Sequence, residues 1–403
     1  MLFAVSIAAS AQLPPVQLPG VQVPALPGVD RAVGNTLREL ASARALRAER
    51  LLRDHRATLD RDPRGNVVVR AEVVAVDITP VALEKALAAK FRVLRTEDFA
   101  DLGMKLTVLQ TPEGMSATRG LKRLRKLDPD GIYDYNHVYF DSAGASPGPA
   151  VRIQAAEASP AAGGSKRIGL IDGGVDAGHQ SFAGLRLQHF GCDGVIVPSA
   201  HGTAVASVLV SRRNVGELFV ADVYCGEPTG GAVDMVAAAF GWMARERVAV
   251  INVSLVGPRN ALLERVVGTL VARGHVVVAA VGNDGPAAPP LYPASYDGVV
   301  GVTGVDDRHR VLIEAGRGAQ VDFAALGANV NAAAKAPDLY APVRGTSFAA
   351  PLVASMLLDL QAPDAAAREQ LLLRLNREAL DLGRPGRDDI YGAGEVGGPP
   401  GRE

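Results

Sequence analysis

This chain has few cysteines, almost no net charge and no long apolar run. It has two cysteines among 403 residues, without C-x-x-C spacing, so neither a metal-binding nor a redox motif is supported. The formal net charge is -1, which excludes a global basic field for nucleic acid. No segment reaches the ~18 consecutive apolar residues of a membrane helix, so we expect no transmembrane anchor.

The length and composition predict a globular protein. A chain of 403 residues exceeds one typical domain, so two folded units, or one large unit with extensions, are expected. Hydrophobic residues make up 48% and charged residues 21%, which is typical of a protein with a large buried core.

The first residues, MLFAVSIAASAQ, join a short apolar run to the small residues Ala9 and Ala11. This pattern is typical of the end of a secretory signal, which predicts a signal peptide over 1–11 with cleavage before Gln12. The run is short and lacks a positively charged start. The alternative is an apolar terminus with no role in export.

Residues 12–65 combine a proline-rich segment with an amphipathic helix. The prolines between Leu13 and Gly28 predict an extended chain. From Asn35 to about Asp60, leucines and alanines recur among arginines at helical spacing. We expect this helix to pack on the next domain rather than to lie on a membrane surface.

Residues 66–141 predict a small α+β module. The valine-rich stretch 66–78 is a strand, after which Thr79 is an N-cap and Pro80 a first helical residue. Further strands are expected over 92–99, 105–111 and 131–140, and a helix is expected over 116–127. The resulting β-α-β-β-α-β order is ferredoxin-like. Residues 142–165, rich in Ala, Gly, Ser and Pro, predict a mobile linker.

Residues 166–396 predict an α/β domain, followed by a tail over 397–403. Continuous apolar runs are typical of buried parallel strands; they cover 167–172, 218–225, 248–255, 275–282 and 298–306. Helical patterns alternate with them over 203–211, 231–248 and 260–274, and a last helix is expected over 364–382. This alternation predicts a parallel sheet with helices on both faces.

Four polar residues are predicted at strand ends or helix starts. Asp172 ends a strand, Asn283 follows another, and His201 and Ser347 begin helices. Their chemistry suits acyl transfer: a serine nucleophile, an imidazole base, a carboxylate that orients the imidazole, and an amide that donates to the oxyanion. Each residue alone fits a turn or a helix cap equally well. The four together, in one chain, favour a catalytic set.

The segments IGLIDGGVD, HGTAVASVL, VVVAAVGNDG and RGTSFAAPLVA resemble the subtilisin-like serine proteases, in the chain order Asp, His, Ser. The resemblance covers about Lys166 to Gly394. It implies a secreted or periplasmic serine endopeptidase that acts through an acyl-enzyme. The module before it resembles the prodomain that serves as chaperone and inhibitor in that family. A self-processing precursor, cut near the start of the linker and with Tyr139 and Phe140 in the cleft, is therefore expected.

The same resemblance implies a substrate-binding cleft. Residues matching its backbone-pairing strand and its specificity pocket are Ser254, Leu255, Val256, Gly257, Ala280, Val281 and Gly282. Leu291 stands where a glycine often forms the pocket floor, which predicts a shallow pocket for small side chains such as Ala or Val. Phe348 replaces a common methionine, which predicts activity that resists peroxide.

Cys192 and Cys225 both fall in the predicted α/β domain. Export would favour a disulfide between them, and two buried free thiols are the alternative. No cofactor is expected. The turn after 203–211 is short and lacks an oxygen-ligand cluster, so a calcium ion is not supported by the sequence.

Protein or peptide substrates and the chain's own prodomain are the expected partners, and we expect a monomer. Two other classes of function remain open at this stage. One is an inactive, binding member of the same fold, which the presence of all four polar residues does not favour. The other is a dinucleotide-binding protein, suggested by the glycines of GLIDGGVDAG, which lack the G-x-G-x-x-G spacing.

Overall fold

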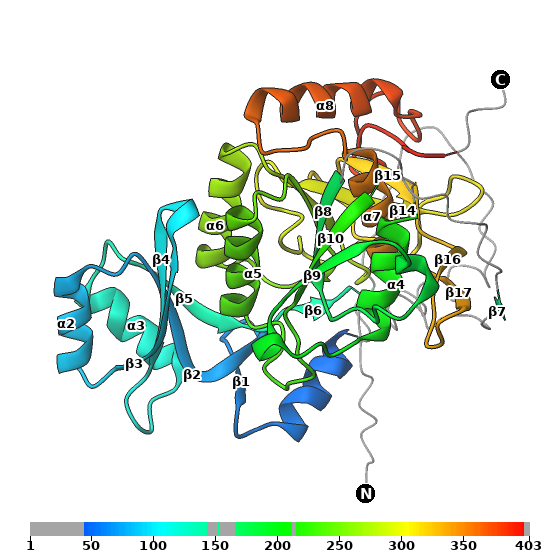
Figure 1. Ribbon diagram of the computed structural model, residues 1–403. Coiled ribbons are helices and arrows are strands. Elements are labelled where there is room, and N and C mark those ends of the chain that lie inside the picture. The colour runs from blue at the N-terminus through cyan, green and yellow to red at the C-terminus, as the bar shows by residue number, and fades with distance from the viewer. Residues whose placement is uncertain (1–43, 143–150, 153–165, 212–214, 399–403) are drawn as a thin grey trace, which may run out of the picture.

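A computed structural model describes residues 44–142, 151–152, 166–211 and 215–398. An N-terminal helix and a small α+β module precede a larger α/β domain (Figure 1). The predicted signal peptide, the proline-rich segment, most of the linker and the last residues of the tail lie outside the described residues. Among those described, no helix is both long and apolar enough to cross a bilayer.

The N-terminal helix covers residues 44–54 and ends before the predicted limit at Asp60. That extension was wrong because the next residues form β1 (Leu59–Arg61), which pairs antiparallel with the start of β2 (Val67–Val76). Asp62 stabilises the connecting turn by accepting the backbone N–H groups of Arg64 and Asn66, each at 2.8 Å.

The module follows the predicted order of elements after β2. These are α2 (Pro80–Ala88), β3 (Arg92–Phe99), η1 (Ala100–Leu102), β4 (Met104–Gln110), α3 (Ala117–Leu127) and β5 (Ile132–His137). The predicted cap at Thr79 is confirmed, since its hydroxyl accepts the N–H of Ala82. The antiparallel sheet has the order β5-β2-β4-β3, and β1 also pairs with β2.

The predicted final strand of the module, 131–140, is two strands in the structure. β5 ends at His137, and β6 (Phe140–Asp141) pairs instead with β12 (Leu255–Val256) of the larger domain. A periodicity read along the chain does not show this change of partner. It brings the end of the module into the α/β domain.

The α/β domain contains a seven-stranded parallel sheet in the order β15-β14-β13-β11-β8-β10-β9. Its strands are β8 (Lys166–Asp172), β9 (Arg186–Phe190), β10 (Val215–Asp222), β11 (Val250–Val253), β13 (Val276–Ala280), β14 (Val300–Val305) and β15 (Phe323–Leu326). The continuous apolar runs are buried on both faces, as parallel strands require.

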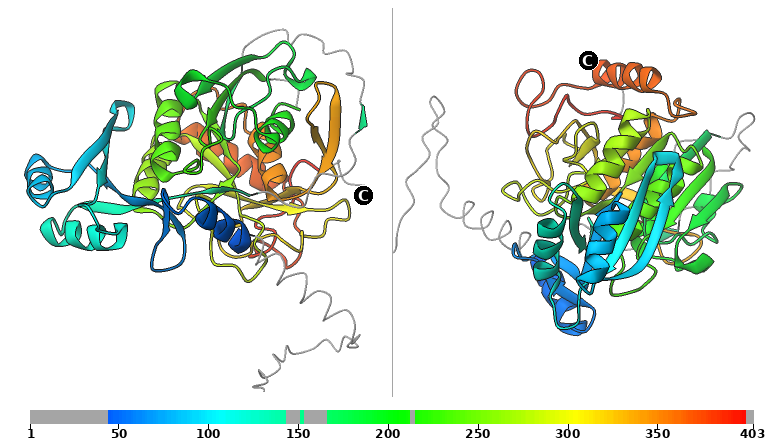
Figure 2. Two further views of the ribbon diagram at one scale, coloured as in Figure 1. Left: turned by 90° about the horizontal axis from the view of Figure 1, so that it is seen from below. Right: turned by 90° about the vertical axis from the view of Figure 1, so that its left-hand side faces the viewer.

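Helices cover both faces of this sheet, which confirms the predicted fold class (Figure 2). Ile171 of β8 packs in the cluster that includes α5 (Val233–Arg245) and α6 (Ala261–Ala272). Leu170, its neighbour, packs with α4 (Ala200–Leu209), α7 (Thr346–Met356) and α8 (Ala365–Glu378). The alternation of side chains along one strand thus builds two cores.

Some elements of the domain were not predicted or were misjudged in length. β9 and the hairpin of β16 (Val330–Ala333) and β17 (Leu339–Val343) are short or mixed in polarity, and β7 (Val151–Arg152) pairs with β17. Helix α8 ends at Glu378, not near Leu382 as predicted. The backbone N–H and C=O of Leu380 form hydrogen bonds with the backbone of Glu395 instead of continuing the helix.

The module packs on α5 and α6 and caps their first turns. Asp134 accepts the N–H of Ala261 at 2.8 Å, and Asn136 accepts the N–H of Asp234 at 3.3 Å. Arg95 donates to the buried carboxylate of Asp234 at 2.7 Å. These contacts satisfy helix N–H groups that would otherwise lack partners, and they fix β5 beside the site described next.

Candidate active site

Asp172, which is buried, and His201, which is partly buried, form a pair at the carboxyl end of the parallel sheet. Asp172 ends β8, and its Oδ1 lies 2.9 Å from Nδ1 of His201, the second residue of α4. Ser199 caps this helix by accepting the N–H of Gly202 at 2.8 Å, which fixes the orientation of the first turn. The sequence placed both residues correctly on their elements.

The two side chains shift each other's protonation. Burial raises the pKa of Asp172 from its ordinary value, and the charge of His201 counters part of this rise. Burial alone would lower the pKa of His201, but the charge and hydrogen bond of Asp172 raise it overall. The arrangement therefore favours the imidazolium form that a general base acquires.

Ser347 lies in the first turn of α7 and is fully buried. Its hydroxyl donates to the backbone carbonyl of Ser142 at 2.7 Å and also contacts the Ser142 hydroxyl. Of these two described residues, the predicted nucleophile Ser347 and the predicted base His201, neither side chain forms a hydrogen bond to the other. His201 Nε2 is buried without a partner, because the Ser347 hydroxyl is turned to the carbonyl of Ser142.

Asn283 is aligned by the same helix. Its Oδ1 accepts the N–H of Thr346 at 3.0 Å, which turns its amide nitrogen toward the cleft. That nitrogen donates to the carbonyl oxygen of Ser142. One backbone carbonyl thus receives hydrogen bonds from both Asn283 and Ser347, the two groups predicted to handle an oxyanion and its nucleophile.

The segment ending at Ser142 lies in the domain as an added strand, visible as β6 in Figure 1. Phe140 and Asp141 pair with Val256 and Leu255, and the N–H of Ser142 donates to the carbonyl of Ser254 at 3.1 Å. Three of the predicted backbone-pairing residues therefore contact this segment. Main-chain pairing of this kind is independent of side-chain identity.

The sequence does not predict the residues that pair with the other edge of this segment. The N–H of Tyr139 donates to the carbonyl of Gly231 at 2.7 Å, and Val138 forms a bridge with Ala232. The sequence predicts residues 231 and 232 only as the start of a helix. Two adjacent glycines before that helix were the available signal, because a side chain at Gly231 would lie 2.3 Å from the carbonyl oxygen of Tyr139.

Gly257, the fourth of the predicted backbone-pairing residues, contacts the cleft segment through a side chain of that segment. Its N–H bonds to the carbonyl of Tyr292 at 2.9 Å rather than to the cleft segment. The ring of Tyr139 lies against it, where a side chain on Gly257 would come 2.5 Å from the ring carbon. Tyr139 is fully buried and donates from its hydroxyl to the carbonyl of Pro258 at 2.6 Å.

The predicted pocket wall and floor lie together. Ala280, Val281 and Leu291 are buried, and Leu291 lies directly over Gly282, whose missing side chain leaves room for it. A methyl group on Gly282 would lie 2.5 Å from the Leu291 side chain. The Leu291 side chain therefore occupies the space that the absent side chain of Gly282 leaves open.

Cys192 and Cys225 form a disulfide, with their Cα atoms 5.2 Å apart. It joins the loop before α4 to the segment after β10. Of the two alternatives left open by the sequence, the structure contains the bonded one. These cysteines and Asp222 are also the one close group of metal-type ligands in the described part of the chain, but the disulfide occupies both sulfurs.

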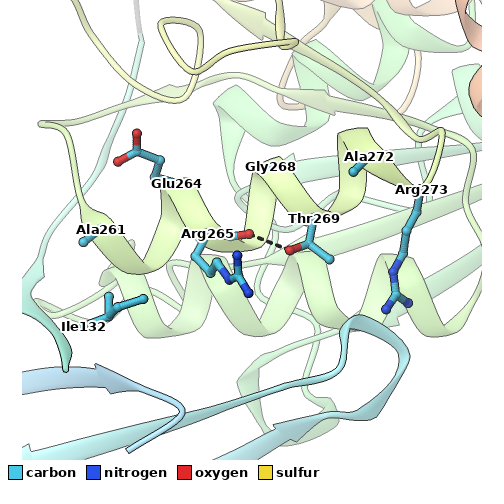
Figure 3. Close-up of a pocket in the computed structure, with 8 residues that line it drawn as sticks. All are labelled: Ile132, Ala261, Glu264, Arg265, Gly268, Thr269, Ala272 and Arg273. Carbon is cyan, nitrogen blue, oxygen red and sulfur yellow. Dashed lines mark hydrogen bonds between the residues drawn. The ribbon is translucent and has the colours of Figure 1, made fainter. Parts of the chain in front are cut away.

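A groove of about 580 Å³ runs along α6, and none of the four predicted catalytic residues lines it. Figure 3 shows its side chains along the helix, with Ile132 from the start of β5 beside them. It lies between the module and the domain and has mostly small or apolar lining residues. We therefore place the functional site at the cleft instead.

Fold and site together define an α/β protein with a carboxylate–imidazole pair, a helix-start serine and an extended segment aligned against them. The model of the subtilase family matches residues 165–394, which is more than half of the chain. The chain belongs to the subtilase family. The match does not include the α+β module.

Curated relatives agree with this assignment. The minor extracellular protease Epr of Bacillus subtilis (strain 168) is 27% identical over 300 residues, which cover 67% of this chain and 46% of Epr. Subtilisin DY of Bacillus licheniformis is 29% identical over 254 residues, covering 58% of this chain and 91% of subtilisin DY. The matched segment thus spans less than half the length of Epr.

Among solved structures, fervidolysin from Fervidobacterium pennivorans, described as a keratinolytic enzyme related to subtilisin, has a TM-score of 0.66 and 18% identity. The similarity covers 82% of this chain and 60% of fervidolysin. At this identity it shows a shared fold. Because 82% exceeds the share matched by the family model, the shared fold extends beyond the subtilase segment.

Proposed function

We propose that the protein is a secreted serine endopeptidase, made as a precursor that cuts its own chain after Ser142. One observation carries this proposal: the carbonyl of Ser142 lies between the hydroxyl of Ser347 and the amide of Asn283. Membership of the subtilase family and the extended pairing of β6 with β12 support it.

The first step is attack of Ser347 Oγ on the carbonyl carbon of Ser142. The hydroxyl turns from the carbonyl oxygen toward Nε2 of His201, which takes its proton as the new C–O bond forms. Asp172 keeps the proton on the other ring nitrogen and stabilises the imidazolium. Asn283 donates to the oxygen as it becomes negative.

The tetrahedral intermediate then breaks the bond between residues 142 and 143. His201 gives its proton to the leaving amine, which leaves an acyl-enzyme between Ser142 and Ser347. Water then attacks the ester, losing a proton to His201, and releases the Ser142 carboxylate with a free Ser347 hydroxyl. This sequence needs no metal or cofactor.

After the cut, residues 138–142 keep every contact described above, so the module remains in the cleft as a product-like inhibitor. The preferred external substrates are extended peptides with a small residue before the cleaved bond, because Leu291 fills the pocket floor. The proposal also includes export and a monomeric state. The disulfide supports export, because disulfides persist in oxidising compartments outside the cytosol.

The test compares the intact mass and N-terminal sequence of the purified wild-type chain and of Ser347→Ala. We expect a wild-type product that begins at residue 143 and an uncut Ser347→Ala precursor. Normal processing of Ser347→Ala would reject self-cleavage. Labelling by a fluorophosphonate, once the cleaved module has been removed from the protease domain, would separate an active enzyme from an inactive binding member of the family, which would not react.

A further inference from the structure

Two arginines of the N-terminal helix contact the cleft without taking part in the chemistry above. Arg44 and Arg47 are three positions apart in a helical segment, so they lie on one face. Arg47 binds both carboxylate oxygens of Asp141, with Nη2 3.0 Å from Oδ2. Asp141 directly precedes Ser142, so this contact is one residue from the bond that we propose is cut.

Arg44 reaches the opposite wall of the cleft. Its Nε lies 2.6 Å from Oδ2 of Asp284, the residue after Asn283. Burial raises the pKa of Asp284, and the charge and hydrogen bond of Arg44 counter that rise. One helix face thus binds both the strand in the cleft and the loop that carries the oxyanion donor.

Apolar contacts hold the same helix over the strand. Ala48, Leu51 and Leu52 pack in one cluster with Phe140 of β6 and with Ala232. The guanidinium of Arg47 also lies 5.6 Å from the centre of the Phe140 ring. In Figure 1 this dark blue helix lies at the lower edge of the domain, below β6.

The charge of Asp141 explains why a cation, Arg47, lies beside it. Asp141 lies close enough to the Asp172–His201 pair to raise the pKa of His201, and Arg47 acts in the opposite direction. Asp141 also raises the pKa of Asp172, because the two carboxylates repel each other, and Arg47 places a cation beside Asp141. Arg47 therefore allows an acidic residue to bind at this position.

We propose that Arg47 and Arg44 are positioning residues for self-cleavage, because they fix the strand ending at Ser142 against the loop of Asn283. The inference rests on the proposed function and deepens it. It assigns recognition of the acidic residue before Ser142 to the N-terminal helix, which after the cut stays covalently joined to the module and not to the protease domain. A detached peptide of the same sequence around the cut has no such partner.

The first experiment measures the rate at which the full chain cuts itself. We expect Arg47→Gln and Arg44→Gln each to slow the cut about fivefold, the upper range for partly exposed ion pairs, and both together to slow it about twentyfold. Arg53→Gln is the matched control, because Arg53 lies on the same helix and pairs at 3.9 Å with the exposed Asp54. Its rate should stay within about twofold of the wild-type rate.

A charge reversal separates positioning from a loss of stability. Arg47→Asp and Asp141→Arg should each slow the cut, and the double variant should restore most of the rate because the ion pair is rebuilt. The same substitutions in a Ser347→Ala background, which cannot cut itself, give the thermal unfolding midpoint. We expect that midpoint to change too little to explain the slower cut.

The outcomes are distinguishable. If the arginine variants cut at the wild-type rate and at the same bond, the positioning role is wrong and the proposed function stands. If the charge-reversed pair cuts no faster than its single variants, the specific pairing is wrong. If the wild-type chain stays uncut, or Ser347→Ala is cut, the proposed function fails and this inference fails with it.

Discussion

At the scale of single residues, the amide of Asn283 is the clearest test of the site. Asn283→Asp keeps the oxygen that accepts the N–H of Thr346 but loses the donor to the Ser142 carbonyl. We expect the self-cleavage rate to fall by a factor on the order of 10²–10³, the effect known for oxyanion donors in this family. The measurement is the rate of appearance of the product beginning at residue 143. Retention of most of the rate would show that Asn283 is not the donor.

Leu291 gives a prediction about specificity. Leu291→Gly removes the side chain that lies over Gly282, so the pocket should accept larger residues. For peptide substrates, we expect kcat/KM with Phe before the cleaved bond to rise about 10- to 100-fold relative to Ala. Leu380→Gly, at an exposed position outside the pocket, is the control. A wild-type enzyme that already prefers Phe or Tyr would contradict the argument.

At the scale of elements, the disulfide joins the loop before α4 to the segment after β10. The bridge links positions 33 residues apart, so its removal should lower the free energy of unfolding by about 2–4 kcal/mol. Chemical denaturation of the Cys192→Ser, Cys225→Ser variant, in a Ser347→Ala background, provides the measurement. A loss below about 0.5 kcal/mol would show that the connected loops do not need the bridge.

The sequence predicted elements well where local chemistry decides them. Thr79 with Pro80 set the start of α2, and unbroken apolar runs identified the parallel strands of the core. The sequence did not predict elements whose conformation depends on a partner strand elsewhere in the chain. Leu59–Arg61 became a strand because β2 lies beside it, and residues after His137 left the module because β12 offers backbone groups to pair with.

The site follows the same division. Family-like segments predict Asp172, His201, Asn283 and Ser347 as candidates, because each follows or begins an element that the apolar pattern defines. The part played by Gly231, and the contacts of Arg44 and Arg47, depend on which surfaces meet after folding. No local spacing encodes these contacts, and so the arginine-rich helix could be predicted but its target could not.

At the scale of the whole molecule, Asp62 links the module to the protease domain. Its carboxylate contacts Nε2 of His137 at 3.2 Å, and the other ring nitrogen of His137 is 2.9 Å from the amide of Asn260, the N-cap of α6. Burial alone would raise the pKa of Asp62, but hydrogen bonds from His137 and Asn66 outweigh it and lower the pKa from 3.8 to about 2.

This shift predicts how precursor stability depends on pH. A pKa lowered by folding stabilises the folded state fully above about 4, and that stabilisation is lost as the pH falls toward 2. In a Ser347→Ala background, the difference in unfolding midpoint between the parent and Asp62→Asn should be largest near pH 7 and shrink between pH 4 and 2. A difference independent of pH would exclude the charge of Asp62 as its cause.

Strand β6 follows the module directly in the sequence, but its backbone hydrogen bonds are made with β12 of the protease domain. Breaking the chain after Ser142 would remove a covalent tether and leave those hydrogen bonds intact. Occupancy of the cleft would then change from an intramolecular equilibrium, independent of concentration, to a bimolecular one. Dilution, such as release into a large external volume, would by itself favour the open enzyme.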